Sequence, residues 1–593
     1  MRRVALLLAV VTAAGGLHVV TAGAAAAADC ITVDMEVSPE KIDLLTDLAK
    51  RFNGSDRAKV DDQCIAVRVA KKSSGEGASL LAEDWPDPKA NGPRPVVWSP
   101  AASAWGEVVN QRRADQGKKA IAPTGKPFML TPLVIAMPQP MAEALGSPNT
   151  PIGYADILRL ANDPAGWGAF GHPEWGPFRL GKTNPNFSTS ALNATIAQYY
   201  AASGKTSGLT LEDLNLSDVD AFARSIESSV VHYGDTTLTF LNNLYRADRR
   251  GTGLTYVSAV AVEEKSVVDF NKGNPDGILD PGEKAKPPRV PLVAIYPKEG
   301  TLFSDNPFFT VDAPWVSAKE KKAAAKFEQY VQQPANQKRV LRFGFRPGNP
   351  QVAIGAPIDA KYGVDPNQPQ TRLELPTPPV LVGLIDRWGQ SRKSARVLMV
   401  IDVSGSMGEP ASGEGGRTKL DLAKQAAVNA LGQFKPEDDV GLWIFSTGIS
   451  RNDPTDYLEL VPIAPIGVQR EAVAGKINDL VPTQGTPLYT VTKAADDQLV
   501  DTFDAQRINA VLLLTDGKNE DDKNNDLDGL LRTLRARNEG QAANPVRVFP
   551  IAYGQNADLP TLKRIAEATN ATVYDAVDPK SISKVFLAVV SNF

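Results

Sequence analysis

Five oxygen-bearing side chains in the last third of the chain stand where strands are expected to end. Asp402 closes a long apolar run, and Ser404 and Ser406 follow it directly. Thr486 opens an expected helix, and Asp516 ends a second apolar run. Ligands of open α/β sheets bind beyond the carboxyl ends of the strands, so we expect these side chains to converge. Two carboxylates and three hydroxyls suit a hard divalent cation such as Mg2+ and leave one position for water or for an oxygen of a partner.

Two other roles compete for these residues. Serine and aspartate also cap helices and form turns, but this does not account for all five at strand ends in this order. A serine nucleophile needs a base, whereas the chain's three histidines, His18, His172 and His232, all precede this region. The G-x-S-x-G pattern of hydrolases is also missing around these serines. We therefore expect recognition, with no catalytic residue and no enzyme activity.

The elements that must position these side chains form an α/β unit over residues 393–593. Near-continuous apolar strands alternate with helices there, which is typical of a doubly wound sheet buried on both faces. The expected strands are 395–402, 439–446, 508–516, 546–554 and 571–576, and the expected helices are about 418–434, 468–480, 487–500, 525–538 and 558–569, with a last helix near the end.

This unit resembles a known family. The motif DVSGSM, followed by GTPL and LLTDG, is similar to the von Willebrand factor A domain and its metal-ion-dependent adhesion site. The resemblance implies a Rossmann-like fold in which Ser404, Ser406 and Thr486 bind the metal directly. It implies that Asp402 and Asp516 act largely through water. It further implies that the metal is Mg2+, or Mn2+ or Ca2+, and that an acidic side chain of a protein partner completes the coordination.

The front part of the chain, residues 29–350, also alternates strands and helices and indicates α/β layers with parallel strands. Expected strands are 31–37, 94–99, 132–138, 253–261 and 290–297, and expected helices lie near 105–114, 152–162, 190–203, 217–228, 236–247 and 317–332. Residues 351–392 are rich in proline and polar residues and predict a linker with one short docking helix.

The front part resembles a periplasmic-type extracellular solute-binding protein, nearest to the oxyanion-binding class. The resemblance rests on segments such as VWSPAASAW, TPLVIAMP, YGDTT and YPKEGTLFSDNPFF, and it implies two lobes with a ligand between them. Hydroxyls and free N–H groups at helix starts suit a small anionic solute, although capping alone explains each of them equally well. The candidate ligand-binding residues are Ser38, Ser99, Ser103, Ser188, Thr189, Ser190, Asp235 and Thr236.

Two further motifs are weaker. The segment GPFRLGKT at 176–183 fits the nucleotide P-loop pattern, but the Asn-Pro-Asn that follows opposes a helix, so we expect a strand at Phe178–Lys182 and no nucleotide. The segment 272–283 has the spacing of a calcium loop, yet Lys272 occupies the first ligand position. A turn-rich loop is the favoured interpretation, with a weak Ca2+ site as the alternative.

The first residues predict export. Arg2 and Arg3 precede an apolar run and an alanine-rich stretch, which is typical of a signal peptide over residues 1–28, with a retained membrane anchor as the alternative. The only cysteines, Cys30 and Cys64, favour one disulfide in a secreted or cell-envelope protein and exclude a zinc site. A net charge of −4 gives no reason to expect nucleic acid as a partner.

These observations predict an exported binding or adhesion protein. A front solute-binding-like module is followed by a von Willebrand factor A domain that recognises a partner through magnesium. The alternative is a transport receptor that delivers an oxyanion or another small solute to a membrane permease. The predicted fold class is α/β throughout.

Overall fold

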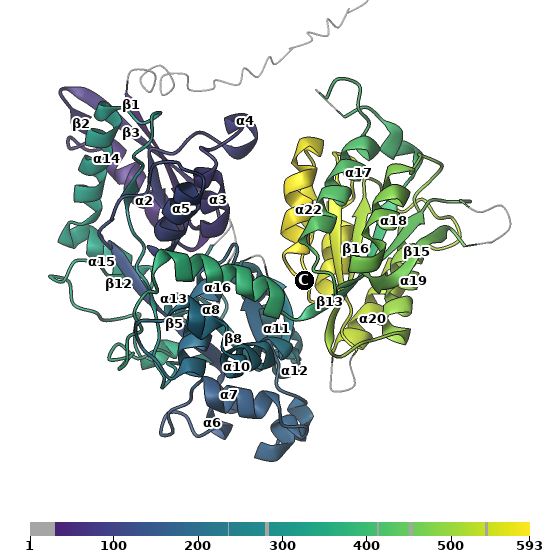
Figure 1. The fold of residues 1–593 in the computed structure, drawn as a ribbon, viewed down its shortest axis with the longest axis horizontal. Coiled ribbons are helices and arrows are strands. Elements are labelled where there is room, and N and C mark those ends of the chain that lie inside the picture. Colours follow the sequence, from purple (N-terminus) through teal and green to yellow (C-terminus); the bar gives the residue numbers. More distant parts are fainter. Residues whose placement is uncertain (1–29, 235, 279–283, 412–413, 450–454, 540–543) are drawn as a thin grey trace, which may run out of the picture.

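The computed structural model describes residues 30–234, 236–278, 284–411, 414–449, 455–539 and 544–593. Its elements form three α/β units, each built on its own sheet. In Figure 1 the first two units, lobe 1 and lobe 2, lie on the left and together form the front module, and the third unit, the C-terminal module, lies on the right. None of the helices in these ranges is long and apolar enough to cross a membrane.

Lobe 1 is built on a five-stranded sheet in the order β11-β4-β1-β3-β2. Strand β1 pairs in parallel with β3 and β4, whereas the short edge strands β2 and β11 are antiparallel. The predicted disulfide joins Cys30, just before β1, to Cys64 in β3. The strands are β1 Ile31–Val37, β2 Lys59–Val60, β3 Gln63–Lys71, β4 Val97–Ser99 and β11 Phe309–Thr310, and the helices are α2 Ile42–Asn53, α3 Ser74–Ala82, α4 Pro88–Asn91, α5 Ala104–Asp115, α14 Ala318–Val331 and α15 Pro334–Arg342.

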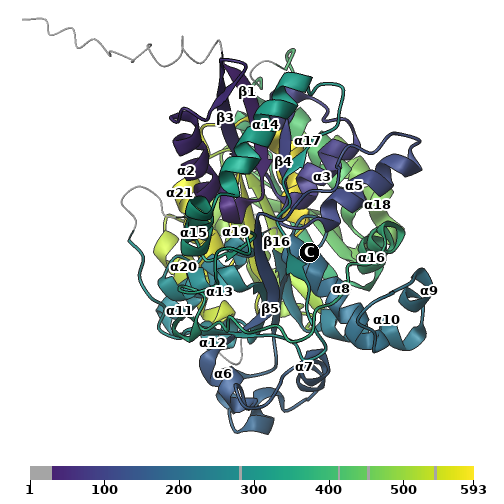
Figure 2. The same ribbon diagram turned by 90° about the vertical axis from the view of Figure 1, so that its left-hand side faces the viewer.

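Lobe 2 lies below lobe 1 in Figure 2 and contains a larger, mixed sheet in the order β10-β5-β8-β6-β7, with β9 and β12 also paired to β5. The strands are β5 Met129–Pro138, β6 Leu180–Thr183, β7 Val230–Gly234, β8 Ala259–Glu263, β9 Leu292–Ile295, β10 Phe303–Ser304 and β12 Arg346–Pro347. The helices are α6 Gln139–Ala144, α7 Tyr154–Ala161, α8 Thr189–Ser203, α9 Leu211–Leu214, α10 Ser217–Ser228, α11 Thr237–Arg250, α12 Gly253–Tyr256 and α13 Glu264–Lys272.

The docking helix predicted within the linker is α16, Pro378–Ser391. It packs against α5 of lobe 1 and against α8, α9 and α10 of lobe 2, so it spans both lobes. Its buried face contains Leu381, Leu384 and Trp388. Two prolines in the first turn start the helix without the loss of any intrahelical hydrogen bond.

The C-terminal module holds a six-stranded sheet in the order β15-β14-β13-β16-β17-β18, the doubly wound arrangement that the apolar runs predicted. Alternate residues of the central strand β13 face two separate cores, with Val397 and Met399 on one face and Leu398 and Val400 on the other. The strands are β13 Ser394–Asp402, β14 Asp439–Phe445, β15 Tyr457–Pro465, β16 Arg507–Thr515, β17 Arg547–Tyr553 and β18 Tyr574–Ala576, and the helices are α17 Lys419–Ala430, α18 Ile466–Asn478, α19 Leu488–Asp501, α20 Leu527–Asn538, α21 Leu559–Ala568 and α22 Ile582–Val590.

The expectation of parallel strands was wrong for several pairs of neighbouring strands. In lobe 2, β5 is antiparallel to β8, β9, β10 and β12. In the C-terminal module, β15 was not predicted, and it pairs antiparallel with β14. The connection between these two strands, residues 446–456, is too short for a crossover helix, so only antiparallel pairing is available. The predicted strand 253–261 is in fact the helical turn α12 followed by β8, since a short apolar run fits either structure.

The C-terminal module is attached to lobe 2 by its last residues. The backbone N–H of Tyr233 in β7 donates to the carbonyl of Asn592 at 3.1 Å, and the side chain of Asn184 donates to the carbonyl of Ser591 at 3.1 Å. Contact with lobe 1 includes a salt bridge from Lys584 of α22 to Glu76 of α3 at 2.6 Å. One continuous hydrophobic core runs through both lobes and the facing side of the third sheet.

Candidate metal centre and interlobe cavity

Asp402 is the last residue of β13 and is completely buried. One carboxylate oxygen accepts from the backbone N–H of Ser404 at 2.7 Å, and the other accepts from the hydroxyl of Thr515 at 2.6 Å. Both donors are neutral, and no salt bridge within the described residues involves Asp402. Burial, together with the neighbouring Asp516 carboxylate, raises the pKa of Asp402 to about 7.

The two serines connect this carboxylate to Asp516. The hydroxyls of Ser404 and Ser406 lie 3.1 Å apart, and the hydroxyl of Ser406 donates to Asp516 at 2.7 Å. Asp516 follows β16 directly and is also completely buried. Because β13 and β16 are adjacent parallel strands, their carboxyl ends meet at the same edge of the sheet.

Thr486 reaches this edge from the connection between α18 and α19. That connection is joined to the loop after β13 by two backbone hydrogen bonds of 2.6 Å, from Thr483 to Val403 and from Gly405 to Gln484. A Cβ atom at Gly517 would lie only 2.8 Å from the Thr486 hydroxyl, so glycine at 517 permits the close approach. Thr486 is buried, and its hydroxyl forms no hydrogen bond within the described part of the chain. The structure thus brings all five predicted side chains to one sheet edge.

Lys419 is a charged neighbour of Asp516 that was not predicted from the sequence. Its ammonium lies 2.8 Å from Asp516 and 2.8 Å from Glu409. It begins α17, which is capped by Thr418: the Thr418 hydroxyl accepts from the N–H of Asp421, and the Asp421 carboxylate accepts from the N–H of Thr418. The sequence Thr-Lys-Leu-Asp carries this capping signal and places the lysine in the first helical turn.

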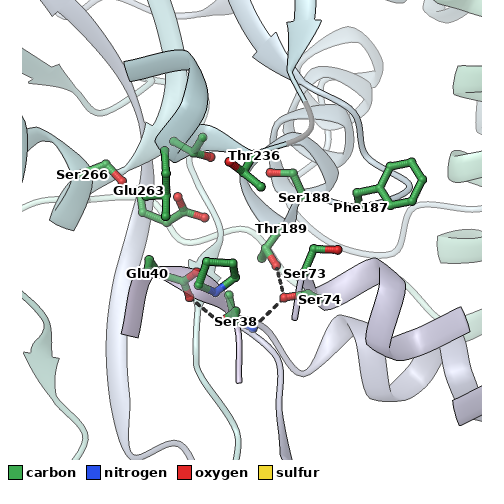
Figure 3. A pocket seen from close by; sticks show the side chains of 14 residues that line it. Ser38, Glu40, Ser73, Ser74, Phe187, Ser188, Thr189, Thr236, Glu263 and Ser266 are labelled. Atoms are coloured by element: carbon green, nitrogen blue, oxygen red, sulfur yellow. Dashed lines mark hydrogen bonds between the residues drawn. The ribbon is translucent and has the colours of Figure 1, made fainter. Parts of the chain in front are cut away.

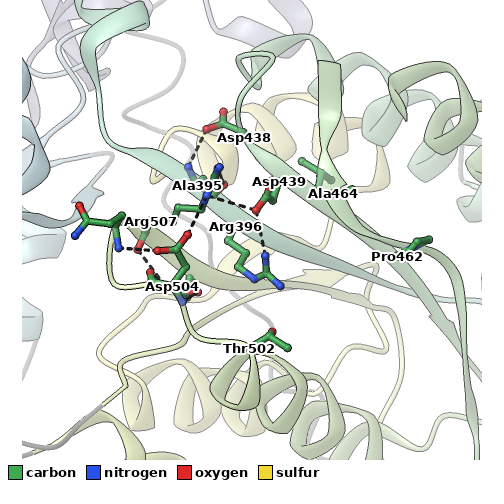
Figure 4. A network of polar contacts seen from close by, with 12 residues as sticks. Ala395, Arg396, Asp438, Asp439, Pro462, Ala464, Thr502, Asp504 and Arg507 are labelled. Carbon is green, nitrogen blue, oxygen red and sulfur yellow. Dashed lines mark hydrogen bonds and ion pairs between the residues drawn. The ribbon is translucent and has the colours of Figure 1, made fainter. Parts of the chain in front are cut away.

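The opposite edge of the same sheet offers a contrast (Figure 4). There Asp438 is buried and bonded to Arg392 at 2.5 Å, and Asp439 pairs with Arg396 at 3.1 Å and with Arg507 at 3.4 Å. The buried acids of that edge therefore have guanidinium partners. At the metal edge, Lys419 neutralises Asp516, but Asp402 has only neutral donors.

The donor set fits a divalent cation. The buried Asp402 carboxylate gains a counter-charge, and the unbonded Thr486 hydroxyl gains a partner, when an ion binds between them. Within the described ranges no group of three or more His, Cys, Asp or Glu residues gathers to hold a metal, so hydroxyl oxygens must supply part of the coordination here. Such a set suits a hard ion such as Mg2+ more than a soft one.

A second site lies between the two lobes (Figure 3). A cavity of about 40 Å3 is enclosed by the residues that follow β1, β3 and β4 of lobe 1 and β6, β7 and β8 of lobe 2. Of the predicted ligand residues, Ser38, Ser188, Thr189 and Thr236 line it. The cavity therefore lies beyond the strand ends of both sheets, which is where ligands of open α/β sheets bind.

The other four predicted residues do not contribute to the described wall of the cavity. Ser190 is buried behind it and bonds the hydroxyl of Thr237 at 2.7 Å. Ser99 is buried with its hydroxyl unbonded among the described residues, and the backbone N–H of Ser103 donates to Asp305 at 2.6 Å. Asp235 lies outside the described residues.

Two carboxylates in the cavity wall were not predicted. Glu40 lies in the first turn after β1, and Glu263 ends β8. Burial, together with the nearby Glu40, raises the pKa of Glu263 to about 8. The paired glutamates of the sequence AVEEK follow a buried strand, and this is the signal from which Glu263 could have been found.

The lobes approach closely around this cavity. The N–H of Gly75 in α3 donates to the carbonyl of Phe187 in lobe 2 at 3.0 Å, and a Cβ atom at Gly75 would lie 1.9 Å from the carbonyl oxygen of Asn186. The indole N–H of Trp105 donates to the hydroxyl of Thr189 at 2.8 Å. The lobes are therefore closed on one another.

The two weaker motifs have structural roles. Lys182 of the P-loop-like segment is on strand β6, fully buried and paired with Glu227. In the calcium-loop segment, Asp276 accepts from the side chain of Asn242 at 2.7 Å and from the N–H of Ile278 at 3.1 Å. Asn274 is also described, and its buried side-chain oxygen has no hydrogen-bond partner among the described residues, whereas the candidate ligands within 279–283 lie outside them.

Comparison with protein families gives two matches. The model of the bacterial extracellular solute-binding proteins matches residues 35–346, which is more than half of the chain. The model of the von Willebrand factor type A domain matches residues 397–587 and includes all five residues of the candidate metal centre.

Individual proteins and solved structures are also similar to this chain. An uncharacterised protein of Mycobacterium tuberculosis, found in two strains, is 23% identical over 92% of this chain and 75% of its own length. A von Willebrand factor type A structure from Catenulispora acidiphila is 23% identical, with a TM-score of 0.27, over 33% of this chain and 42% of that chain. The sulfate-binding protein SubI of M. tuberculosis H37Rv is 16% identical, with a TM-score of 0.34, over 56% of this chain and 96% of that chain.

A third similar structure contains zinc. It is proximal thread matrix protein 1 of the mussel byssus with a zinc-occupied adhesion motif, and it is 19% identical, with a TM-score of 0.26, over 33% of this chain and 47% of that chain. From the family matches, this chain belongs to the bacterial extracellular solute-binding proteins and carries a von Willebrand factor type A domain after its solute-binding module.

Proposed function

We propose that this protein is an extracytoplasmic binding protein that recognises a macromolecular partner through a divalent cation at the carboxyl edge of the third sheet. Ser404, Ser406 and Thr486 would bind the ion directly, and Asp402 and Asp516 would hold it largely through water. When bound, the ion supplies a concentrated positive charge. An acidic side chain of the partner would complete the coordination. No catalytic step is part of the proposal.

The observation that carries this proposal is the electrostatic asymmetry of the sheet. At the edge shown in Figure 4, buried aspartates are paired with arginines. At the metal edge, Asp402 is equally buried, but its donors among the described residues are all neutral: the N–H and hydroxyl of Ser404 and the hydroxyl of Thr515. A buried charge without a counter-charge is costly, and a bound divalent cation removes that cost.

Two threonines at the ends of one helix give a matched test. Thr486 precedes α19 at the metal edge, and Thr502 follows α19 at the opposite end. Thr486→Val removes one proposed ligand and keeps the side-chain volume, whereas Thr502→Val makes the same change away from the site. Mg2+ titration by calorimetry should show at least tenfold weaker binding for Thr486→Val and unchanged binding for Thr502→Val. Equal Mg2+ affinity in both variants and the parent would remove Thr486 from the site.

The partner is tested with the same pair of variants. The full chain is used to capture cell-envelope proteins in the presence of Mg2+ or of a chelator. A specific partner should be retained by the parent and by Thr502→Val only when Mg2+ is present, and Thr486→Val should not retain it. Retention that is independent of Mg2+ would contradict recognition through the ion.

A second function is favoured by the interlobe cavity. We propose that the front module binds a small solute there, as a receptor for transport or sensing. The closed contacts of Gly75 with Phe187 and of Trp105 with Thr189 support this proposal, because they enclose a cavity at the ends of six strands. Solute binding should persist in a chelator, which separates this function from the first.

A further inference from the structure

The chemistry of the cavity wall indicates which solute it receives. We propose that the interlobe cavity binds the ammonium head of a cationic solute, and that it does not bind an oxyanion. This inference rests on the second proposed function, solute binding by the front module. It is independent of the metal centre.

The described wall of the cavity is acidic. Its polar side chains are the carboxylates of Glu40 and Glu263 and a set of serine and threonine hydroxyls, and no lysine, arginine or histidine lines it within the described residues. Glu263 is only 6% exposed and takes part in none of the salt bridges between described residues. An oxyanion placed here would face two acids without a basic residue to offset them.

The nearest buried ammonium groups are already bound elsewhere. Lys41 donates to the carbonyl of Pro100 at 2.8 Å and to the side chain of Asn306 at 2.8 Å, while Lys265 pairs with Asp269. Neither lysine lines the cavity. Both act on the cavity acids only through space: burial lowers the pKa of Lys41 and Glu40 opposes this, while burial raises the pKa of Glu263 and Lys265 opposes this. Neither lysine forms a salt bridge with these acids among the described residues.

Helix starts around the cavity do not change this balance. Helix α8 begins at Thr189 and α13 begins immediately after Glu263, so both direct partial positive charge towards the cavity. The two carboxylates of the protein lie at comparable positions, Glu263 directly before α13 and Glu40 in the first turn after β1. Glu40 places negative charge there, and Glu263, whose pKa of about 8 keeps it largely protonated near neutral pH, loses its proton when an ammonium group binds beside it.

Ser266 provides an independent sign of a ligand. It lies in the first turn of α13, is 4% exposed and lines the cavity beside Glu263 (Figure 3), yet its hydroxyl forms no hydrogen bond among the described residues. Although the residue is buried, its hydroxyl oxygen is not among the buried atoms without a partner, so it faces the cavity and is free to bond a ligand there. An ammonium group carries three donors and no acceptor, so Glu40, Glu263 and Ser266 together offer it a complementary set of acceptors.

The size of the cavity favours the end of a larger molecule. About 40 Å3 suffices for a head group of a few atoms. The cavity adjoins a groove of about 880 Å3, because Pro39, Ser73, Phe187, Thr236 and Leu238 line both. The groove is also lined by Leu80 of α3 and Leu587 of α22 and can hold an apolar body of the solute, whereas its charged residues are mostly basic: Lys71, Lys72, Arg246 and Lys584, with the acids Glu76 and Asp276. The ammonium head therefore has its favourable place in the small cavity, where no basic residue lines the described wall.

A metal ion is the other cation to consider. Hard cations in protein sites take six or more oxygen ligands from carboxylates, other oxygens and water. The cavity presents two carboxylates with serine and threonine hydroxyls, which are the same types of donor as in the proposed metal centre. Titration with CaCl2 therefore decides between a metal ion and an ammonium group in this cavity.

Calorimetric titration of the full chain in a chelator tests the inference with four-carbon probes that differ only in their ends. The probes are 1,4-diaminobutane, 1,4-butanediol and succinate, with sulfate as a small oxyanion; CaCl2 is titrated separately without chelator. We expect saturable binding of the diamine at one molecule per chain. We expect no binding, or at least tenfold weaker binding, of the other probes.

Three variants assign the binding to the cavity. Glu263→Gln keeps the shape of the side chain and mimics its protonated form, so it should fold, and it should weaken diamine binding at least tenfold. Ser266→Ala removes one acceptor and should weaken it severalfold. Glu328→Gln, a partly buried acid on α14 away from the cavity, should bind as the parent does.

The outcomes separate the inference from the function on which it rests. Binding of succinate, sulfate, the diol or Ca2+ in preference to the diamine would overturn the cationic class and retain a solute site. No binding of any probe would overturn both. Diamine binding that is equal in the parent and in a folded Glu263→Gln, as judged by circular dichroism, would place the amine outside this cavity and also overturn the inference.

Discussion

Lys419 is the residue that most affects the metal centre without being a proposed ligand. Its ammonium is almost buried and touches Asp516 and Glu409, so in the metal-free protein it is the cation closest to the two carboxylates. A fixed positive charge stabilises the empty site. The same charge repels an incoming divalent ion.

Lys419→Met should therefore make folding more dependent on metal. Without metal, loss of the buried ion pair should lower the free energy of unfolding by roughly 3 kcal/mol. With Mg2+ present, part of this loss should be recovered, so the rise in melting temperature on adding Mg2+ should be larger than in the parent. Lys424→Met, on the exposed side of the same helix, is the control. An equal Mg2+-induced rise in Lys419→Met and the parent would contradict this role.

Glu263 gives a prediction for pH. Its carboxyl has a pKa of about 8 in the folded protein against an ordinary value of 4.5, because of burial first and Glu40 second, with Lys265 acting in the opposite direction. The folded state keeps the proton over a range in which the unfolded chain loses it. The contribution of Glu263 to stability is therefore fully present below about pH 4.5 and is lost as pH rises towards 8.

The comparison of Glu263→Gln with the parent isolates this effect from the other acids. Urea unfolding at pH 5 and pH 8 should show that the stability of Glu263→Gln relative to the parent increases at the higher pH. The difference in the free energy of unfolding between Glu263→Gln and the parent should change by no more than about 1.4 kcal/mol per pH unit. A difference that stays constant between the two pH values would show that Glu263 is ionised in the folded protein.

At the scale of single residues, the metal set was predictable and the cavity acids were not. Asp402, Ser404, Ser406, Thr486 and Asp516 stand at apolar strand ends in one order, and strand ends meet in space by topology alone. Glu40 has no such position, and Glu263, although it ends the apolar strand β8, belongs to no ordered set of strand-end residues that would pair it with Glu40. Their environment depends on how two lobes close, and this is set by packing between residues far apart in the chain.

At the scale of elements, long periodic segments were predicted well and short edges were not. Strands β1 and β13 and helices α8 and α10 lie within a residue or so of their predicted limits because each is an uninterrupted apolar or amphipathic segment bounded by capping or turn-forming residues. The strand β15 was missed because only part of it is buried, and its pattern is therefore weak. Antiparallel pairing of β5 depends on partners distant in sequence, which no local signal reveals.

Helix α3 gives a prediction at this scale. Gly75 allows α3 to meet the loop before α8, where a Cβ atom would lie 1.9 Å from the carbonyl oxygen of Asn186. Gly75→Ala should hold the lobes apart without damage to either. Small-angle X-ray scattering should show a larger radius of gyration than for the parent. Gly389→Ala on α16, where nothing lies within 4 Å of the new atom, should leave the radius unchanged. A parent-like radius for Gly75→Ala would mean that this contact does not set closure.

At the scale of the whole molecule, the solute-binding and von Willebrand factor A modules share buried structure. Glu227 of α10 is paired with Lys182 in β6, accepts from the hydroxyl of Tyr233 at 2.6 Å and accepts from the indole of Trp388 in α16 at 3.2 Å. The hydroxyl of Tyr233 in turn accepts from the N–H of Lys393, directly before β13. One buried carboxylate therefore connects lobe 2, the linker helix and the start of the third sheet.

Glu227→Gln should destabilise both modules together. It leaves the buried Lys182 without a counter-charge, which costs about 3–5 kcal/mol. Calorimetric melting of the parent should give one main transition, since a continuous core joins the modules, and the variant should show that same transition at a lower temperature. Two separate transitions, of which only one shifts, would contradict the coupling.

The most direct test of the metal centre is a crystal of the full chain soaked in Mn2+ and measured at the manganese absorption edge. The account predicts one anomalous peak at the carboxyl edge of β13 and β16, with the hydroxyl oxygens of Ser404, Ser406 and Thr486 within about 2.2 Å and one position open to water or to a neighbouring acid. A map without a peak there, in a crystal that binds Mn2+ elsewhere, would contradict the central claim.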